Sequence, residues 1–317
     1  MEETSNLTKQ RCEPEASERN GVDGPAQVPM PMVKRILVGV GTFTALGLVL
    51  WADKLCSYGA VLAAVCAALT VGGLLEFCRM LRLIGVEVSR LLVAAAGTAL
   101  LLVLWFGWAL QSDPACPRWL ADPGTAALAL LILTVLGMLA ARASAGRIEG
   151  SAEAAAFAAL GLLYVPVPLA FMGALHAQWG LKAVVTAVVV CKSTDVGGYL
   201  AGRTIGGPLL APVVSPRKTV AGAIGALVAA VLASCVLALL HVSAMGLPLA
   251  VLYGVLMTLV AITGDLAESV LKRRAGMKDS GRLLPGQGGV LDMIDDVIFA
   301  APFSWLFFLL AAPGLLP

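Results

Sequence analysis

The residues with the clearest potential for chemistry lie between positions 264 and 296, flanked by two long apolar runs. This segment reads GDLAESVLKRRAGMKDSGRLLPGQGGVLDMIDD and combines carboxylate clusters, a Lys-Arg-Arg run, a Lys-Asp pair and a glycine-rich turn. Carboxylate oxygens are ligands that Mg²⁺ prefers, and Lys and Arg side chains bind phosphate groups. The set predicts a site for a phosphorylated ligand and a divalent metal at a membrane surface.

The first half of the segment predicts a helix that carries polar groups on one face. Asp265, Ser269 and Lys272 are spaced i, i+4 and i+7, so they lie in file along that face. Arg273 lies beside them, and Gly276 weakens the helix shortly afterwards. We therefore expect the preceding span to continue as a helix through Asp265 into the cytoplasm.

A second cluster of carboxylates begins the next apolar run. Asp292, Asp295 and Asp296 are spaced i, i+3 and i+4 and share one helical face. The helix macrodipole alone favours carboxylates at a helix N-terminus, which is the structural alternative for these three. That account does not extend to Asp265, which lies near the end of the preceding helix. We predict that Asp265, Asp292 and Asp295 bind one Mg²⁺ between two antiparallel helices.

Two charged residues lie inside an earlier apolar span. Lys192 and Asp195 follow a run of Val and Ala, at a depth where each charge costs roughly 2.5–3.5 kcal/mol. Such residues usually face a polar cavity, although a pair spaced i, i+3 can also neutralise itself on one helix face. The following Gly197, Gly198 and Gly202 either permit close packing or loosen this helix.

The loop after that span contains the run VSPRKTVAG. We expect Ser215 to be a helix N-cap and Pro216 to lie in the first helical turn. Arg217 and Lys218 add positive charge to the free backbone N–H groups, which together predict an anion site. The alternative is an interfacial loop that binds lipid headgroups without specificity.

The elements that must position these residues are membrane spans. Hydrophobic residues make up 59% of the chain and charged residues 13%, with a mean hydropathy of +0.90. Apolar runs near the length that crosses a bilayer recur, at 36–51, 57–78, 91–110, 124–141, 153–176, 180–201, 220–243, 247–266 and 290–312. The sequence thus predicts an all-α, polytopic membrane protein with about nine transmembrane helices.

The predicted domain organisation is simple. Residues 1–33 are polar and predict a disordered cytoplasmic tail, without the apolar core of a signal peptide. Residues 34–317 predict a single transmembrane domain whose motifs fall within 190–296. We expect the first span to remain attached to the chain.

The distribution of basic residues predicts the orientation. If the N-terminus is cytoplasmic, 18 of the 22 Lys and Arg residues fall on the cytoplasmic side. This bias agrees with the positive-inside rule and places residues 264–296 in the cytoplasm, on the inner face of the plasma membrane. The net charge of only +2 does not indicate a nucleic-acid partner.

Two stretches resemble one known family. The run SVLKRRAGMKDSGRLLPGQGGVLDMID, residues 269–295, resembles the C-terminal signature of the phosphatidate cytidylyltransferases, the CDP-diacylglycerol synthases. The TDVGGYLAGRTIG and SPRKTVAG segments within 194–222 are similar to a second region of that family. Three positions depart from the family pattern: Gln287 replaces a usual His, Met293 a usual Arg, and Ala221 a usual acidic residue.

The resemblance implies a reaction and roles for individual residues. The expected reaction converts CTP and phosphatidate to CDP-diacylglycerol and diphosphate with Mg²⁺. The expected catalytic residues are Asp265, Ser269, Lys272, Arg273, Asp292 and Asp295. The expected substrate-binding residues are Lys192, Asp195, Ser215, Arg217, Lys218, Thr219, Lys278, Asp279, Gly286, Gln287, Gly288 and Gly289. Membrane lipids are the expected surroundings of the site.

Other functions are consistent with parts of the pattern. A CTP-dependent kinase of a polyprenol or phytol would use similar groups, with a carboxylate such as Asp195 as base. A transporter or a non-catalytic membrane homologue would explain charge within a span, although the charges crowd onto one side and no inverted repeat is evident. The sequence leaves open whether a monovalent cation assists Mg²⁺ and whether the chain forms a homodimer.

Overall fold

The computed structural model describes residues 47–49, 51–53, 56–111, 113, 116–117, 120, 122–212, 214–243, 245–281 and 288–311. These residues belong to one compact unit, Gly41–Pro317. The predicted tail at 1–33 lies outside the described residues, as does most of the predicted span at 36–51, of which residues 47–49 are helical.

The described chain is almost entirely helical, as predicted. Its elements are η1 (Ser57–Gly59), α2 (Ala60–Leu83), α3 (Arg90–Leu110), α4 (Pro123–Ser144), α5 (Ser151–Tyr164), α6 (Pro166–Trp179), α7 (Leu181–Thr204), β1 (Leu209–Ala211), β2 (Ser215–Thr219), α8 (Val220–Leu239), α9 (Leu247–Arg274) and α10 (Val290–Ala311). Within the described residues, eight helical segments are long and apolar enough to cross a membrane, with α5 and α6 counted together. The chain is an integral membrane protein of the all-α class.

The span predicted at 153–176 is divided into two helices. The helix α5 ends at Tyr164, and α6 begins at Pro166. Proline lacks a backbone N–H and disfavours helical geometry in the residue before it, here Val165. Val165 accordingly has φ −100° and ψ −65°, away from the centre of the helical region. The division therefore follows from local chemistry that the hydropathy pattern does not report.

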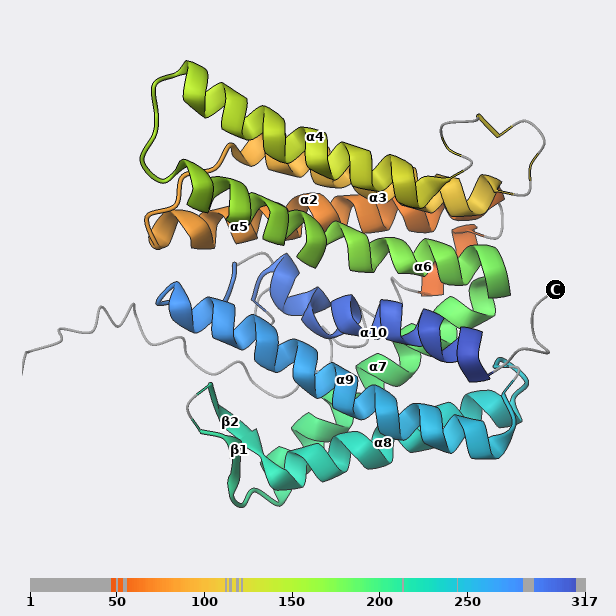
Figure 1. Cartoon of the computed structure of the whole chain (residues 1–317). Coiled ribbons are helices and arrows are strands. Elements are labelled where there is room, and N and C mark those ends of the chain that lie inside the picture. The colour runs from red at the N-terminus through yellow and green to blue at the C-terminus, as the bar shows by residue number, and fades with distance from the viewer. Residues whose placement is uncertain are drawn as a thin grey trace, which may run out of the picture. The chain divides into compact units, whose positions relative to one another are not determined.

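The helices that carry the charged residues pack on one another in series. The helix α7 packs against α8, α8 against α9, α9 against α10, and α10 in turn against α6 and α2 (Figure 1). The α7–α8 contact depends on small residues, because a Cβ atom on Gly197 would lie 2.3 Å from the carbonyl oxygen of Gly225. Of the two roles expected for the α7 glycines, the structure shows close packing.

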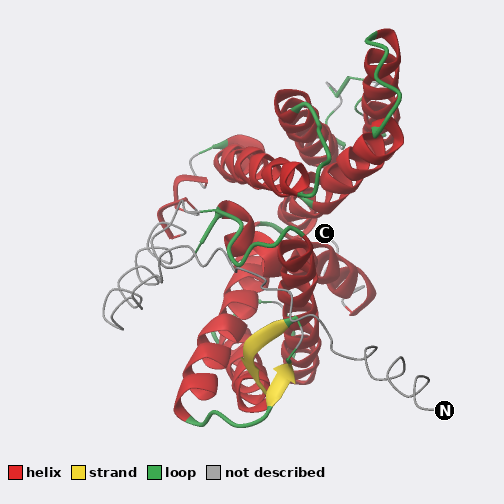
Figure 2. Ribbon diagram, turned by 90° about the vertical axis from the view of Figure 1, so that its left-hand side faces the viewer, coloured by secondary structure: helices red, strands yellow, loops and turns green. Residues whose placement is uncertain are grey.

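A short hairpin connects α7 to α8 (Figure 2). The strands β1 and β2 are antiparallel, with Leu209 opposite Thr219 and Ala211 opposite Ser215. The predicted N-cap at Ser215 is therefore wrong. Thr219 caps α8 instead, since its hydroxyl accepts a hydrogen bond from Gly222 N at 3.1 Å. Pro216 is tolerated in β2 because a two-stranded sheet has only edge strands.

The predicted end of α9 is confirmed in detail. The helix continues through Asp265 to Arg274, and Gly276 adopts φ +67° just beyond it. Met277 N donates to Lys272 O at 2.9 Å, and Gly276 N donates to Arg273 O at 3.1 Å. This pair of bonds is the Schellman motif, in which glycine takes the left-handed position at no steric cost. The motif stops the helix and turns the chain toward α10.

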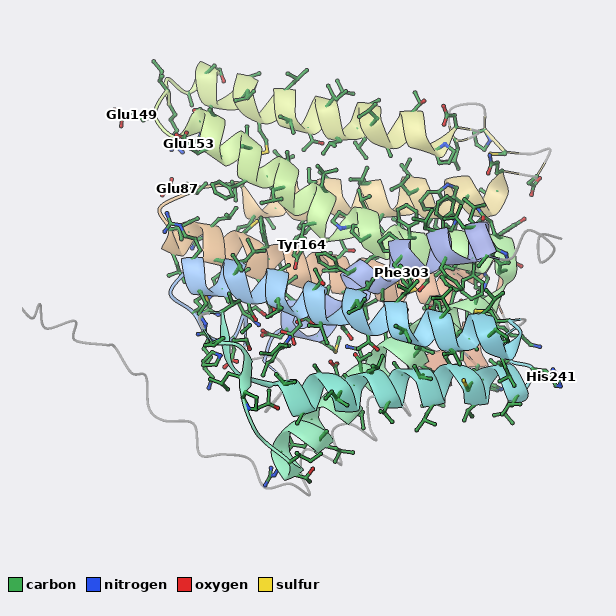
Figure 3. The ribbon with its side chains drawn as sticks, turned by 60° about the horizontal axis from the view of Figure 1, so that its bottom comes forward. Glu87, Glu149, Glu153, Tyr164, His241 and Phe303 are labelled. Atoms are coloured by element: carbon green, nitrogen blue, oxygen red, sulfur yellow. The ribbon has the colours of Figure 1, made fainter. Side chains whose placement is uncertain are left out.

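The connections α2–α3, α4–α5, α7–α8 and α9–α10 lie at one end of the bundle (Figure 1). Glu87, Glu149 and Glu153 mark this end, and His241 marks the other (Figure 3). Arg142 joins two of these connections by donating to the carbonyl oxygen of Glu87 at 2.9 Å. The motif-bearing loops therefore share one side of the membrane-spanning bundle.

Candidate active site

A cavity of about 200 Å³ opens among α7, the hairpin, α8 and α9. Its polar lining includes Thr194, Asp195, Lys218, Thr219 and Asp265. The glycines at 198, 202 and 222 line it as well, together with apolar residues such as Ala226 and Ile262. The cavity is therefore lined by both charged and apolar residues, which suits a ligand with an anionic head and an apolar body.

One ion pair stands at this cavity. Lys218 Nζ on β2 lies 2.5 Å from Asp265 Oδ2 on α9, and the Asp265 side chain is 34% exposed. The two residues are separated by 47 positions and meet because the hairpin folds back beside α9, where Arg273 Nε donates to Val214 O at 3.4 Å. A cation and a carboxylate thus face a common space that a phosphate group could enter.

The helices α9 and α10 are in close contact beside Asp265. A Cβ atom on Gly264 would lie 2.7 Å from the carbonyl oxygen of Asp295 and 3.0 Å from the ring of Phe299, so no larger residue fits there. The backbone of Asp295 therefore lies against the residue that precedes Asp265 in α9. Asp295 Oδ1 accepts a hydrogen bond from Asp296 N at 2.8 Å. The predicted antiparallel pairing of these two helices is confirmed.

The Lys192 side chain forms its closest contacts with α10 and does not line the cavity. Its ammonium lies 2.7 Å from Asp296 Oδ1, 2.8 Å from Met293 O and 3.6 Å from Asp195 Oδ2. The other oxygen of Asp296 accepts from Cys191 Sγ at 3.1 Å. Since Lys192 is neutralised chiefly by another helix, the simple Lys192–Asp195 pair considered from the sequence is incomplete. Asp195 lines the cavity, and its side chain is 55% exposed.

A second ionic group is buried between α9 and α10. Lys272 Nζ contacts the carboxylate of Glu268 and lies 2.6 Å from Asp292 Oδ1. Asp292 Oδ2 accepts hydrogen bonds from Ser280 N at 2.8 Å, from Ser280 Oγ at 2.8 Å and from Gly289 N at 2.7 Å. Both oxygens of Asp292 are thus occupied by groups of the protein itself.

The glycine-rich turn before α10 encloses two carboxylates. Gly288 has φ +91°, and a Cβ atom there would lie 2.3 Å from Asp292 Oδ2. A Cβ atom on Gly289 would lie 2.3 Å from Glu76 Oε2. These glycines, which we expected to approach a phosphate, leave room for protein side chains instead. The neighbouring Gly286 and Gln287 lie outside the described residues.

Carboxylates are the main polar partners of the lysines in this part of the structure. Three lysines, Lys192, Lys218 and Lys272, form ion pairs with the five carboxylates of Asp195, Asp265, Glu268, Asp292 and Asp296. Carboxylate oxygens are the ligands that Mg²⁺ prefers, so the donor chemistry fits this metal.

The three carboxylates predicted to share Mg²⁺ are not gathered at one point. Among the described residues, no group of three or more His, Cys, Asp and Glu side chains is arranged to hold a metal ion. Asp292 is directed toward Ser280 and the start of α10, whereas Asp265 is directed toward Lys218. The physical reason is that the N–H groups preceding α10 satisfy Asp292 locally.

The remaining predicted residues occupy more peripheral places. Ser269 is buried, and its hydroxyl lies 3.5 Å from Asp265 Oδ1. Arg273 is exposed and donates only to backbone carbonyl oxygens. Lys278 and Asp279 lie in the loop after α9 and make no hydrogen bond or ion pair with other described residues. The side chain of Arg217 lies outside what the structure describes.

Four residues to which the sequence assigned no role in the site help to shape it. They are Glu76 on α2, Glu268 on α9, Ser280 in the following loop and Asp296 on α10. Asp296 and Glu268 were visible as charges in the motif segment, but nothing in their spacing assigned partners to them. Glu76 offered one signal, because it is the only acidic residue in the apolar run 57–83.

The fold and these contacts define an integral membrane protein with a charged cavity among its helices. Residues 33–311 match the sequence profile described as the Cytidylyltransferase family. The chain belongs to this family.

Named relatives agree with the family match. The chain is 34% identical to the phosphatidate cytidylyltransferase of Helicobacter pylori (strain J99 / ATCC 700824) over 269 residues, which cover 84% of this chain and 88% of that protein. It is 44% identical to the phosphatidate cytidylyltransferase of Brucella suis biovar 1 (strain 1330) over 151 residues, 47% of this chain and 56% of the relative. The matched region thus spans only about half of the Brucella protein.

Proposed function

We propose that this protein transfers the cytidylyl group of CTP to phosphatidate, with CDP-diacylglycerol and diphosphate as products. The observation that carries the proposal is the Lys218–Asp265 pair, which lies at a part-apolar cavity inside a membrane-spanning bundle. A soluble phosphorylated substrate would not require a site among membrane helices, whereas a lipid phosphate does. The relatives' printed name, phosphatidate cytidylyltransferase, supports the same reaction.

The proposed chemistry requires little acid–base help from the protein. An oxygen of the phosphatidate monoester attacks the α-phosphorus of CTP, and the bond from that phosphorus to the β-phosphate oxygen breaks, releasing diphosphate. The second pKa of a phosphate monoester is about 6, so the nucleophile is largely ionised at cytoplasmic pH. The main demands are to align two polyanions and to stabilise the departing diphosphate.

The chain's own residues divide this work in the proposal. Lys218 binds a substrate phosphate at the cavity, and Asp195 and Asp265 orient the polar groups around it. Asp265 and Asp295 are the residues that would hold Mg²⁺, because both are carboxylates beside the close contact of α9 and α10 at Gly264. When bound, Mg²⁺ neutralises charge that develops on the phosphates.

The proposal includes a location and an orientation. The bias of Lys and Arg toward one set of loops supports an inner-membrane protein whose site faces the cytoplasm, where CTP is available. Phosphatidate then enters from the inner leaflet, with its headgroup in the cavity and its acyl chains in the bilayer.

The test uses the full chain purified in detergent with labelled CTP, phosphatidate and Mg²⁺. Formation of a labelled CDP-lipid together with diphosphate is the expected result. Free CDP together with a phosphorylated polyprenol or phytol, when that alcohol is supplied, would show a kinase instead. The absence of both products from protein that remains folded would overturn the enzymatic proposal in favour of a non-catalytic homologue.

A further inference from the structure

Glu76 on α2 reaches the start of α10 from a distant part of the sequence. Its Oε1 accepts a hydrogen bond from Val290 N at 3.0 Å, and its Oε2 accepts from Leu291 N at 2.9 Å. The first N–H groups of a helix have no partner within the helix, and a carboxylate at that position also complements the macrodipole. Glu76 is therefore a cap for α10 that is supplied by another helix.

The surrounding backbone is built to admit this carboxylate. A Cβ atom on Gly281 would lie 2.1 Å from Glu76 Oε1, and one on Gly289 would lie 2.3 Å from Glu76 Oε2. Any side chain at either position would displace the carboxylate from the helix start. Two glycines from the loop between α9 and α10 thus enclose a residue that lies more than 200 positions earlier.

The cap is linked to the proposed site by a short series of contacts. Ser280 Oγ lies 2.8 Å from Glu76 Oε2 and 2.8 Å from Asp292 Oδ2. Because a hydroxyl has one proton, it bonds to one of these carboxylates at a time. Asp292 in turn holds Lys272 at 2.6 Å, and Lys272 shares a helical face with Asp265. Movement of Glu76 would be transmitted to Lys272 through two residues.

We propose that Glu76 is a positioning residue for the cytidylyl transfer: it fixes the start of α10, the helix that carries Asp295. Through Ser280 and Asp292 it also fixes Lys272, which joins α10 to α9. This inference rests on the proposed function. Glu76 does not line the cavity, so it acts without touching substrate. A misplacement of about 1 Å in catalytic groups can lower turnover by 10²-fold, which makes such a contact consequential.

The test compares Glu76→Gln with Glu87→Gln in the full chain. Glu87 is an exposed glutamate at the same end of the bundle (Figure 3), and its side chain makes no hydrogen bond or ion pair with other described residues. For Glu76→Gln we expect kcat to fall about 10- to 100-fold while KM for CTP changes less than about threefold. Glu87→Gln should match the wild type in both constants.

Two further measurements separate positioning from general destabilisation. The double variant Glu76→Gln, Ser280→Ala should be no worse than the more damaging single change, because the two residues act in one series. Hydrogen exchange at the amides of Val290 and Leu291 should accelerate about tenfold in Glu76→Gln, while exchange in α3 stays unchanged. The exchange readout needs no substrate, so it tests the cap even if the wild type makes no CDP-lipid.

The outcomes distinguish the two proposals. If the wild type makes no CDP-lipid but Glu76→Gln still accelerates hydrogen exchange at the start of α10, the proposed reaction is refuted and only the capping role of Glu76 remains. An active wild type with unchanged kcat in Glu76→Gln would refute the positioning role alone. Additive losses in the double variant, accompanied by faster exchange throughout the chain, would also refute it, since they would show a residue that merely stabilises the fold.

Discussion

Two ionic groups among the described residues, one around Lys272 and one formed by Lys218 and Asp265, differ in how far they are enclosed by the protein. Around Lys272, the side chains are enclosed: Lys272 is 12% exposed, Asp292 9% and Glu268 0%. At the cavity, Lys218 is 22% exposed and Asp265 34%, and each has only the other as ion-pair partner among the described residues. The group around Lys272 therefore has a structural role, whereas the Lys218–Asp265 pair can still bind a ligand.

This difference changes how each charged residue should be interpreted. A lysine enclosed by two carboxylates has little free charge to offer to a substrate phosphate. A lysine at a cavity can exchange its carboxylate partner for a phosphate without leaving a buried charge unpaired. The sequence motif contains both kinds of residue and does not distinguish them, whereas exposure and partner number do.

The largest expected effect would come from breaking the enclosed group. Replacing Lys272 with Met leaves Glu268 and Asp292 buried beside each other without a cation, and removal of one partner from a buried ion pair typically costs about 3–5 kcal/mol. We expect a loss of this size in the free energy of unfolding, measured by denaturant titration of detergent-solubilised protein. The matched change Lys218→Met should cost less than about 1 kcal/mol. Equal losses from the two variants would contradict the contrast between the groups.

The next largest effect concerns the cavity carboxylate. Asp265→Asn should lower turnover at least about 100-fold, equivalent to about 2.7 kcal/mol, because the variant loses charge where we propose that Mg²⁺ binds. The assay is CDP-lipid formation at saturating CTP and Mg²⁺. Glu153→Gln, on an exposed position at the same end of the bundle, provides the control (Figure 3). A loss below threefold would remove Asp265 from the proposed site.

Much of the architecture could be predicted from the sequence because membrane spans have a strong local signal. Eight of the nine predicted spans correspond to helical segments among the described residues, and the ninth falls mostly outside them. The shared face of Asp265 and Lys272 also follows from helical periodicity alone. The end of α9 was readable because Gly276 is a local signal for a helix C-terminus.

Contacts between helices could not be predicted in the same way. Spacing indicates which residues share a helix face, but it does not indicate which helix packs against that face. For Lys192, spacing could offer only Asp195, three positions away, as an alternative to a polar cavity, whereas Asp296 on α10 is the closer partner. The N-cap error at Ser215 has a similar origin, because pairing with Ala211 in the hairpin overrides a local capping signal. The role of Glu76 could not be predicted for the same reason, because its hydrogen bonds to Val290 N and Leu291 N join helices that are far apart in the sequence.

Two glycines of α7 provide a matched test of the α7–α8 contact beside the cavity. A Cβ atom on Gly197 would lie 2.3 Å from a backbone oxygen of α8, whereas one on Gly198 would meet its nearest atom at 3.5 Å. We expect Gly197→Ala to force the helices apart and cost about 1–3 kcal/mol of stability, and Gly198→Ala to leave stability nearly unchanged. Denaturant titration of both variants would measure this difference. Similar values for the two would show that α7 and α8 are not in close contact.

The smallest expected effect concerns Lys218 at the cavity. It tests whether the less enclosed of the two ionic groups binds substrate. Lys218→Met should raise KM for a substrate about tenfold, because one charge-assisted contact to a phosphate contributes about 1.5–3 kcal/mol and Asp265 is left free to bind a cation. The measurement is steady-state kinetics with CTP and phosphatidate varied separately, which also reveals which phosphate Lys218 contacts.

Arg147→Ala, in the connection between α4 and α5, controls for attraction to anionic lipid and should leave KM unchanged. Equal, small changes in both variants would mean that the basic residues only bind the membrane surface. A tenfold change confined to Lys218→Met, in protein of normal stability, would show that an incompletely enclosed charge marks the substrate side of this bundle.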